Sequence, residues 1–168
     1  MAAVLGIVRG HNGAIRIGSH EGVGTEVRVL LPLRETREVT AAAGERGTVL
    51  VVDDDQGVLA IARRVLSSHG YKVLTAVNGV EGVACFQQNA AEIRVVLMDM
   101  TMPQMNGLTA LQRIRALGSS VPVLLSSGYG ASAALHSQQF SGVLSKPYGF
   151  SELISAVDGA LGVSAVER

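Results

Sequence analysis

Residues 49–55 read VLVVDDD, a short apolar run that ends in three consecutive aspartates. Two other runs end in charged residues: VVLM at 95–98 precedes Asp99, and GVLS at 142–145 precedes Lys146. All strands of a parallel sheet point the same way, so these ends would meet at one edge, where open α/β folds bind ligands. Carboxylates and an ammonium group gathered at one point describe a site for a metal ion and a phosphate.

The stretch from 48 to 163 alternates strand-like and helix-like segments. Its five apolar runs are rich in Val and Leu, as strands buried on both faces of a sheet should be. Apolar residues recur at helical spacing between most of these runs, and a short helix is expected in the polar segment 127–141. Five βα units with right-handed crossovers predict an α/β fold with a doubly wound, flavodoxin-like parallel sheet in the order 2-1-3-4-5. The runs lie at 48–53, 71–75, 94–98, 121–126 and 142–145.

Capping residues mark the expected helix starts. Asn78, with Glu81 three residues later, is a typical capping pair. Asp55 is interpreted as the cap of the first helix after 48, because aspartate is favoured at that position. Asp53 and Asp54 remain as candidate ligands.

Composition excludes several partners. Lys+Arg and Asp+Glu both number 14, so the formal charge is zero and neither nucleic acid nor an anionic membrane is expected to bind. The single cysteine, Cys85, excludes a disulfide framework within one chain and fits a reducing compartment. No apolar run reaches the roughly 18 residues of a membrane span, and the N-terminus lacks a signal-peptide pattern. A cytoplasmic chain without membrane contact is expected.

A hard dication such as Mg²⁺ suits the point where Asp53, Asp54 and Asp99 should meet. Mg²⁺ prefers oxygen ligands and accepts one or two carboxylates together with water and phosphate oxygens. The charges of the three carboxylates, the ion and Lys146 cancel before a phosphoryl group arrives. Without the metal, mutual repulsion should raise the pKa of at least one carboxylate.

Four stretches together resemble the receiver domain of two-component response regulators. They share with that family an acidic pair, a lone aspartate followed by Met-Pro and Asn-Gly, a hydroxyl with a small neighbour, and a Lys-Pro pair, in the same order and spacing. The match covers essentially all of 48–163 and leaves 164–168 as a tail. The stretches are VLVVDDDQ (49–56), VLMDMTMPQMNG (96–107), VLLSSGYG (123–130) and VLSKPYGFSEL (143–153).

The resemblance implies that Asp99 is the phosphoacceptor, which attacks a phosphohistidine and forms an aspartyl phosphate. Mg²⁺ would neutralise charge on the transferring phosphoryl oxygens. Its ligands would be Asp54, Asp99 and the backbone carbonyl of Thr101, with Asp53 reaching the ion directly or through water.

Lys146 and Ser127 would contact phosphoryl oxygens by an ion pair and a hydrogen bond respectively. Ser126 is the neighbouring hydroxyl, but alternation along a strand points it to the other side of the sheet. Pro147 follows the lysine directly, and in the family this peptide bond is commonly cis, which places the lysine.

Further positions resemble those that modulate signalling in the family. Val143 stands where receivers often carry an aromatic residue whose rotamer reports phosphorylation, and valine has almost no such choice. A shift of Ser127 would then be read out through Tyr129 or through movement of 130–141. Thr101 and Tyr129 resemble positions that tune dephosphorylation by controlling access of water.

The first 33 residues resemble the C-terminal end of a histidine kinase ATP-binding domain. They predict a helix ending near Gly10, a turn at Asn12-Gly13, and a hairpin with strands at 14–19 and 25–31. The Asn-bearing and main Gly-rich boxes of that family are missing, so residues 1–33 are not expected to hold ATP. The charged segment 34–47 is expected to be a linker.

Together the resemblances describe the end of a hybrid histidine kinase. The chain is expected to be not a kinase itself but a receiver that catalyses its own phosphorylation and slow dephosphorylation. Its partner would be a histidine kinase or a histidine phosphotransfer protein. The small hairpin must dock on the receiver, pair with a second copy in a homodimer, or remain free. The alternative function is a protein-interaction domain of the same fold that works without phosphorylation. A third possibility, a phosphatase, is disfavoured because no general acid lies beside the nucleophile.

Overall fold

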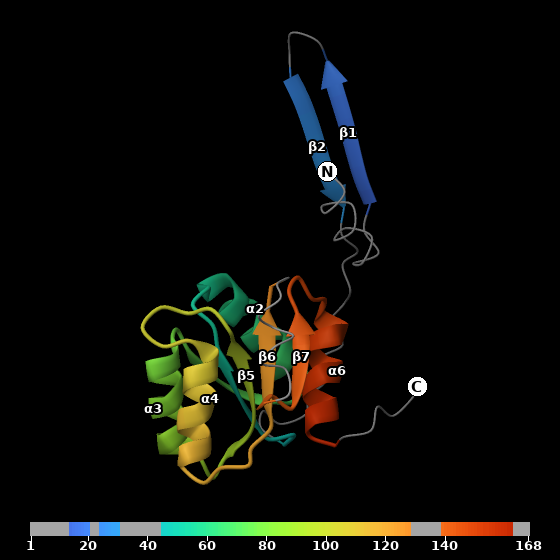
Figure 1. The fold of residues 1–168 in the computed structure, drawn as a ribbon. Helices are drawn as coiled ribbons and strands as arrows, with labels where there is room; N and C mark the ends of the chain where they lie inside the picture. The colour runs from blue at the N-terminus through green and yellow to red at the C-terminus, as the bar shows by residue number, and fades with distance from the viewer. Residues whose placement is uncertain (1–13, 21–23, 31–44, 129–138, 163–168) are drawn as a thin grey trace. The chain divides into compact units, whose positions relative to one another are not determined.

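The chain divides into two units, Met1–Arg37 and Glu38–Arg168. A computed structural model describes residues 14–20, 24–30, 45–128 and 139–162 (Figure 1). The helix expected to end near Gly10 and the turn expected at Asn12-Gly13 lie outside these residues. So does most of the segment 127–141, for which a short helix is expected. No helix of the described ranges is long and apolar enough to cross a membrane.

The first unit contains an antiparallel hairpin of β1 (Ala14–His20) and β2 (Gly24–Leu30). This confirms the two strands predicted there, each within one residue of its expected ends. Ile15 pairs with Val29 and Ile17 with Val27, so apolar side chains share one face of the hairpin.

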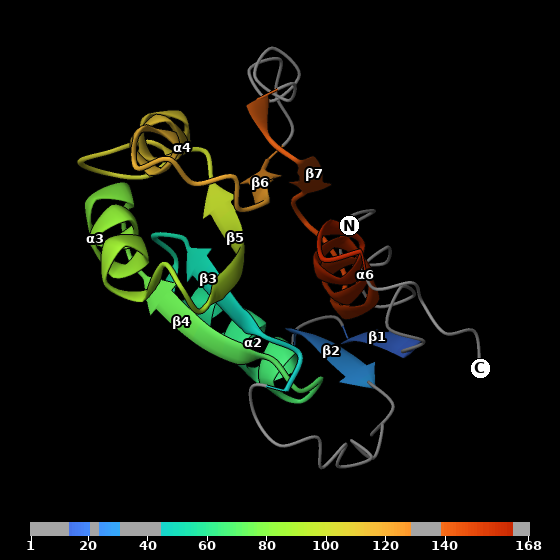
Figure 2. The same cartoon turned by 90° about the horizontal axis from the view of Figure 1, so that it is seen from below.

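The second unit is built on a five-stranded parallel sheet in the order β4-β3-β5-β6-β7 (Figures 1 and 2). Counted from the first strand of this unit, the order is the predicted 2-1-3-4-5. The switch point lies between β3 and β5, the strands that lead to Asp53 and Asp99. The strands are β3 (Thr48–Val52), β4 (Lys72–Ala76), β5 (Ile93–Asp99), β6 (Val123–Ser127) and β7 (Gly142–Ser145).

Helices cover both faces of this sheet. Figure 2 shows α3 (Gly79–Asn89) and α4 (Gly107–Ala116) on one face, and α2 (Gln56–Ser67) and α6 (Phe150–Ala160) on the other. Alternate residues of β3 enter the two cores: Leu50 and Val52 pack on the α3 and α4 side, Val49 and Val51 on the α2 and α6 side. The strand is therefore apolar at every position, because it is buried on both faces.

Side-chain caps begin the helices where the sequence places them. Asp55 Oδ1 accepts hydrogen bonds from the amides of Gly57 (2.7 Å) and Val58 (3.3 Å) at the start of α2. Asn78 Oδ1 accepts from the amide of Glu81 (2.9 Å) at the start of α3. Asp55 is thus a structural cap, and its carboxylate is committed to the backbone of α2.

Replacing Asp55 with alanine should lower the free energy of unfolding by about 1 kcal/mol, because the first amides of α2 lose their acceptor. Urea denaturation measures this change. Asp55→Asn is the matched control: asparagine caps helices equally well, so this variant should keep the wild-type stability. Equal losses in the two variants would contradict the capping role.

Candidate functional site

Four charged side chains from three strand ends converge at the carboxyl edge of the sheet. Asp53 and Asp54 follow β3, Asp99 ends β5, and Lys146 follows β7. The ammonium nitrogen of Lys146 lies 2.7 Å from Asp53 Oδ2 and 2.8 Å from Asp99 Oδ1. The sequence predicted the convergence but not that Lys146 bridges the two carboxylates.

The acidic residues differ in burial. Asp53 and Asp99 are only 2% and 6% exposed, whereas Asp54 is open to solvent. Each of the three offers a carboxylate oxygen, and these atoms lie within 4.8 Å of one another. Oxygen donors at this spacing fit a small, hard dication that keeps part of its water shell on the exposed side.

Backbone amides fix the carboxylates. The amide of Thr101 donates to Asp99 Oδ2 at 3.0 Å, and the amide of Asp55 donates to Asp53 Oδ1 at 3.0 Å. Both oxygens of Asp99 therefore have a donor, Lys146 on one side and Thr101 on the other. The backbone carbonyl of Thr101, the fourth expected metal ligand, stays a prediction.

Burial and charge act on the pKa values of the site in opposite directions. Burial raises the pKa of Asp99, Lys146 opposes that rise, and Asp53 adds to it by repulsion. Burial alone would lower the pKa of Lys146, but its contacts with Asp53 and Asp99 outweigh this effect and raise it. One carboxylate pKa is raised as predicted, although the main cause is burial and repulsion is secondary.

The two serines at the end of β6 face opposite sides of the sheet. Leu124 packs in the core beneath α2 and α6, so strand alternation puts Ser126 on that side and Ser127 on the other. The hydroxyl of Ser127 donates to the carbonyl of Gly128 at 3.1 Å. The amide of Lys146 donates to the carbonyl of Ser127 at 2.8 Å, which ties the two proposed phosphoryl contacts together.

The loop after Asp99 is shaped by a glycine. A β-carbon on Gly107 would lie 2.2 Å from the carbonyl oxygen of Asp99, closer than any real contact. The amide of Gly107 donates to the carbonyl of Met100 at 3.0 Å and closes the loop. Gly107 therefore supports the position of Asp99 without chemistry of its own.

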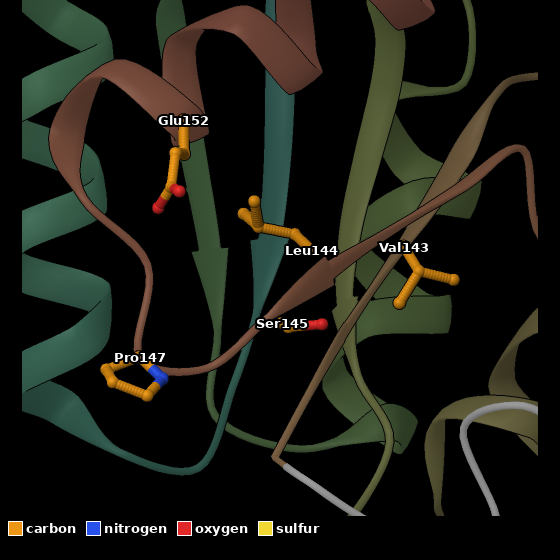
Figure 3. A pocket seen from close by; sticks show the side chains of 5 residues that line it. All are labelled: Val143, Leu144, Ser145, Pro147 and Glu152. Atoms are coloured by element: carbon orange, nitrogen blue, oxygen red, sulfur yellow. The ribbon is translucent and has the colours of Figure 1, made fainter.

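Two of the expected modulating positions, Val143 and Pro147, lie in β7 (Gly142–Ser145) and just after it. Val143 is 44% exposed, and the Lys146-Pro147 peptide bond is cis, as the resemblance implied. Figure 3 shows Val143 and Leu144 on opposite sides of the strand, beside a shallow cavity that Glu152 also lines. Tyr129 lies outside the described residues, so its modulating role stays a prediction.

Comparison with known proteins identifies the family. The response regulator receiver domain family matches residues 49–158. The chain belongs to this family. Its members are the phosphoacceptor modules of two-component signalling, and they generally bind Mg²⁺ at their acidic pocket. The chain is therefore a receiver module of two-component signalling.

Several proteins are similar to this receiver. A receiver domain from Clostridium thermocellum superimposes with a TM-score of 0.65 at 30% identity, covering 69% of this chain and 94% of that one. The chemotaxis protein CheY of Treponema pallidum is 41% identical over 83 residues, which are 49% of this chain and 58% of CheY. The sensor kinase CckA of Brucella abortus is 30% identical over 175 residues. That match covers 94% of this chain but only 18% of the kinase.

In the absence of divalent cations, Asp99→Asn should raise the melting temperature near neutral pH. The raised pKa of Asp99 means that its charged form opposes folding. At a pH below the ordinary carboxyl pKa, the group is protonated in both the folded and the unfolded state, and it does not affect stability. At a pH above the raised pKa of the folded state, the group is charged in both states, and the full destabilisation is present. The gain should therefore grow as the pH rises through that interval, while Lys146 keeps Asp53 as its partner.

Melting curves in EDTA as a function of pH measure this gain. Asp54→Asn is the control, because that carboxylate is exposed and hydrated, and its removal should change the melting temperature less. A lower melting temperature for Asp99→Asn at neutral pH would contradict the prediction.

Proposed function

We propose that Asp99 accepts a phosphoryl group from a phosphohistidine. The observation that carries this proposal is the Lys146 ammonium 2.8 Å from Asp99 Oδ1, beside two further carboxylates. A carboxylate oxygen of Asp99 attacks the phosphorus, the bond between phosphorus and the donor's imidazole nitrogen breaks, and its electron pair leaves with the imidazole. The product is an acyl phosphate on Asp99.

The surrounding groups divide the remaining work. The Thr101 amide holds Asp99 Oδ2, which leaves Oδ1 as the attacking atom. Lys146 now holds Oδ1. When this oxygen bonds to phosphorus and loses its negative charge, the ammonium pairs with a phosphoryl oxygen instead. The Ser127 hydroxyl, released from the carbonyl of Gly128, donates to a second phosphoryl oxygen.

The metal ligands in this proposal are Asp53, Asp54 and Asp99, with the backbone carbonyl of Thr101. The support is the donor set itself: three carboxylate oxygens within 4.8 Å, one of them on an exposed residue. When bound, Mg²⁺ would neutralise charge on the transferring phosphoryl group.

The donor or recipient of the phosphoryl group is a histidine kinase or a histidine phosphotransfer protein, the partners with which receiver domains interact. We further infer that residues 1–33 are the end of a kinase ATP-binding domain, 34–47 a linker, 48–163 the receiver and 164–168 a tail. The similarity to CckA supports this division, because it covers 94% of the chain and so extends well beyond the receiver match. The parent protein would then be a hybrid histidine kinase.

Incubation with acetyl phosphate and Mg²⁺, followed by intact mass measurement, tests the proposal. The wild type should gain one acid-stable, base-labile phosphoryl group, and Asp99→Asn should gain none. Lys146→Met should be phosphorylated about tenfold to a hundredfold more slowly, because a charge-assisted contact to the phosphoryl group is lost.

Asp55→Asn is the matched control for these variants, since it removes an aspartate of the same cluster that serves only α2. It should be phosphorylated at the wild-type rate, and EDTA should abolish the adduct in both proteins. No adduct on the folded wild type at saturating donor would favour the alternative, an interaction domain that works without phosphorylation.

A further inference from the structure

Two buried hydroxyls beneath the site play no part in the chemistry above. The oxygens of Ser126 and Tyr148 are screened from solvent, and neither has a hydrogen bond of normal geometry among the described residues. Both lie on the side of the sheet covered by α2 and α6, because Tyr148 packs against the same core as Leu124. Tyr148 directly follows the Lys-Pro pair, but no motif in the sequence singles it out.

The two hydroxyls adjoin each other. Burial raises the pKa of Tyr148, and a hydrogen-bonding contact with the Ser126 hydroxyl, which lies outside normal hydrogen-bond geometry, opposes that rise. Lys146 also opposes it, whereas Asp53 and Asp99 add to it, so the phenol lies within the field of the acidic site. The hydroxyls are thus close enough to interact with each other and lie near the site, yet neither is in normal hydrogen-bond geometry.

Unpaired buried hydroxyls oppose folding, since each loses its hydrogen bonds to water. Phenylalanine and alanine would fill these positions without that cost. Native structures hold few such groups, and destabilising features of this kind concentrate at functional sites. The pair therefore calls for a functional reason.

The position of the pair supplies one. Ser126 is the cross-strand partner of Asp99 and directly precedes Ser127. Tyr148 lies two residues after Lys146, in the turn that leads from β7 to α6. The hydroxyls thus belong to the two chain segments that carry the proposed phosphoryl contacts, but on the opposite face of the sheet.

We propose that Ser126 and Tyr148 are positioning residues that hydrogen-bond each other when a phosphoryl group bridges Ser127 and Lys146. A backbone hydrogen bond between Lys146 and Ser127 already joins the end of β6 to the turn after β7. The bridging group shifts these joined segments slightly, and this shift completes the bond between the two hydroxyls. An interaction formed only as the phosphoryl group is transferred lowers the barrier, whereas one already present would not. The inference rests on the proposed roles of Ser127 and Lys146.

The test compares phosphorylation rates and melting temperatures of full-length variants with acetyl phosphate and saturating Mg²⁺. Tyr148→Phe and Ser126→Ala should each be phosphorylated about fivefold more slowly, the effect of one net hydrogen bond. Their melting temperatures should equal or exceed that of the wild type, and their Mg²⁺ dissociation constants should be unchanged. The double variant should be no slower than either single one, and Ser126→Thr, which keeps the hydroxyl, should retain the wild-type rate.

Tyr71→Phe is the matched control. Tyr71 is fully buried at the other end of the sheet, and its hydroxyl donates to the carboxylate of Asp158. Removing this paired hydroxyl should lower the melting temperature and leave the phosphorylation rate unchanged. The two tyrosine variants should thus show opposite patterns of stability and rate.

Several outcomes would overturn the inference. One is that Tyr148→Phe is phosphorylated at the wild-type rate. Another is that the double variant is slower than either single variant, so that the two rate losses multiply. A third is that the variants lose Mg²⁺ affinity by the same factor as they lose phosphorylation rate. If Tyr148→Phe melts at a lower temperature than the wild type, its slower phosphorylation could come from lost stability. The rate and melting temperature of Ser126→Ala then decide the test by the same criteria. A wild type that takes up no phosphoryl group would instead refute the proposed function.

Discussion

The contact of one ammonium group with two buried carboxylates sets the architecture of the site. Asp53 and Asp99 end neighbouring strands and are almost completely removed from water, so their charges would strongly oppose folding without a partner. Lys146 supplies that partner at 2.7 and 2.8 Å. A buried ion pair contributes little net free energy to folding. The stability of the fold therefore comes from the surrounding packing and not from the contacts within the site.

The neighbouring structure serves to keep these charges in place. The amides of Asp55 and Thr101 each donate to one carboxylate, and Gly107 allows the following loop to pass close to the backbone of Asp99. Even so, the pKa of Asp99 stays raised, chiefly because burial disfavours its charged form and secondarily because Asp53 repels it. Three carboxylates face a single ammonium group in this pocket, so it favours the arrival of positive charge, and receiver domains generally bind Mg²⁺ there.

The proposed roles of the hydroxyl groups differ between the two faces of the sheet. Ser127 lies on one face, where its hydroxyl can turn toward a phosphoryl group, and Ser126 and Tyr148 lie on the other. Val143 occupies the position at which other receivers often have an aromatic switch. An aromatic residue of this chain, Tyr148, lies two positions beyond the lysine and packs on the side of the sheet covered by α2 and α6.

The sequence alone determined the strands, their order and the identity of the charged groups at their ends. Buried parallel strands need unbroken apolar runs, and caps such as Asp55 and Asn78 depend on neighbours only two or three residues away. Such local patterns can be recognised in the sequence alone.

Only the tertiary structure decided that Lys146 bridges Asp53 and Asp99, residues 93 and 47 positions away in the chain. It alone showed that burial rather than repulsion dominates the pKa of Asp99, and that two hydroxyls without a hydrogen bond of normal geometry are buried beneath the site. Burial and contacts of this kind depend on how strands and helices pack across the whole sheet, which no local spacing records.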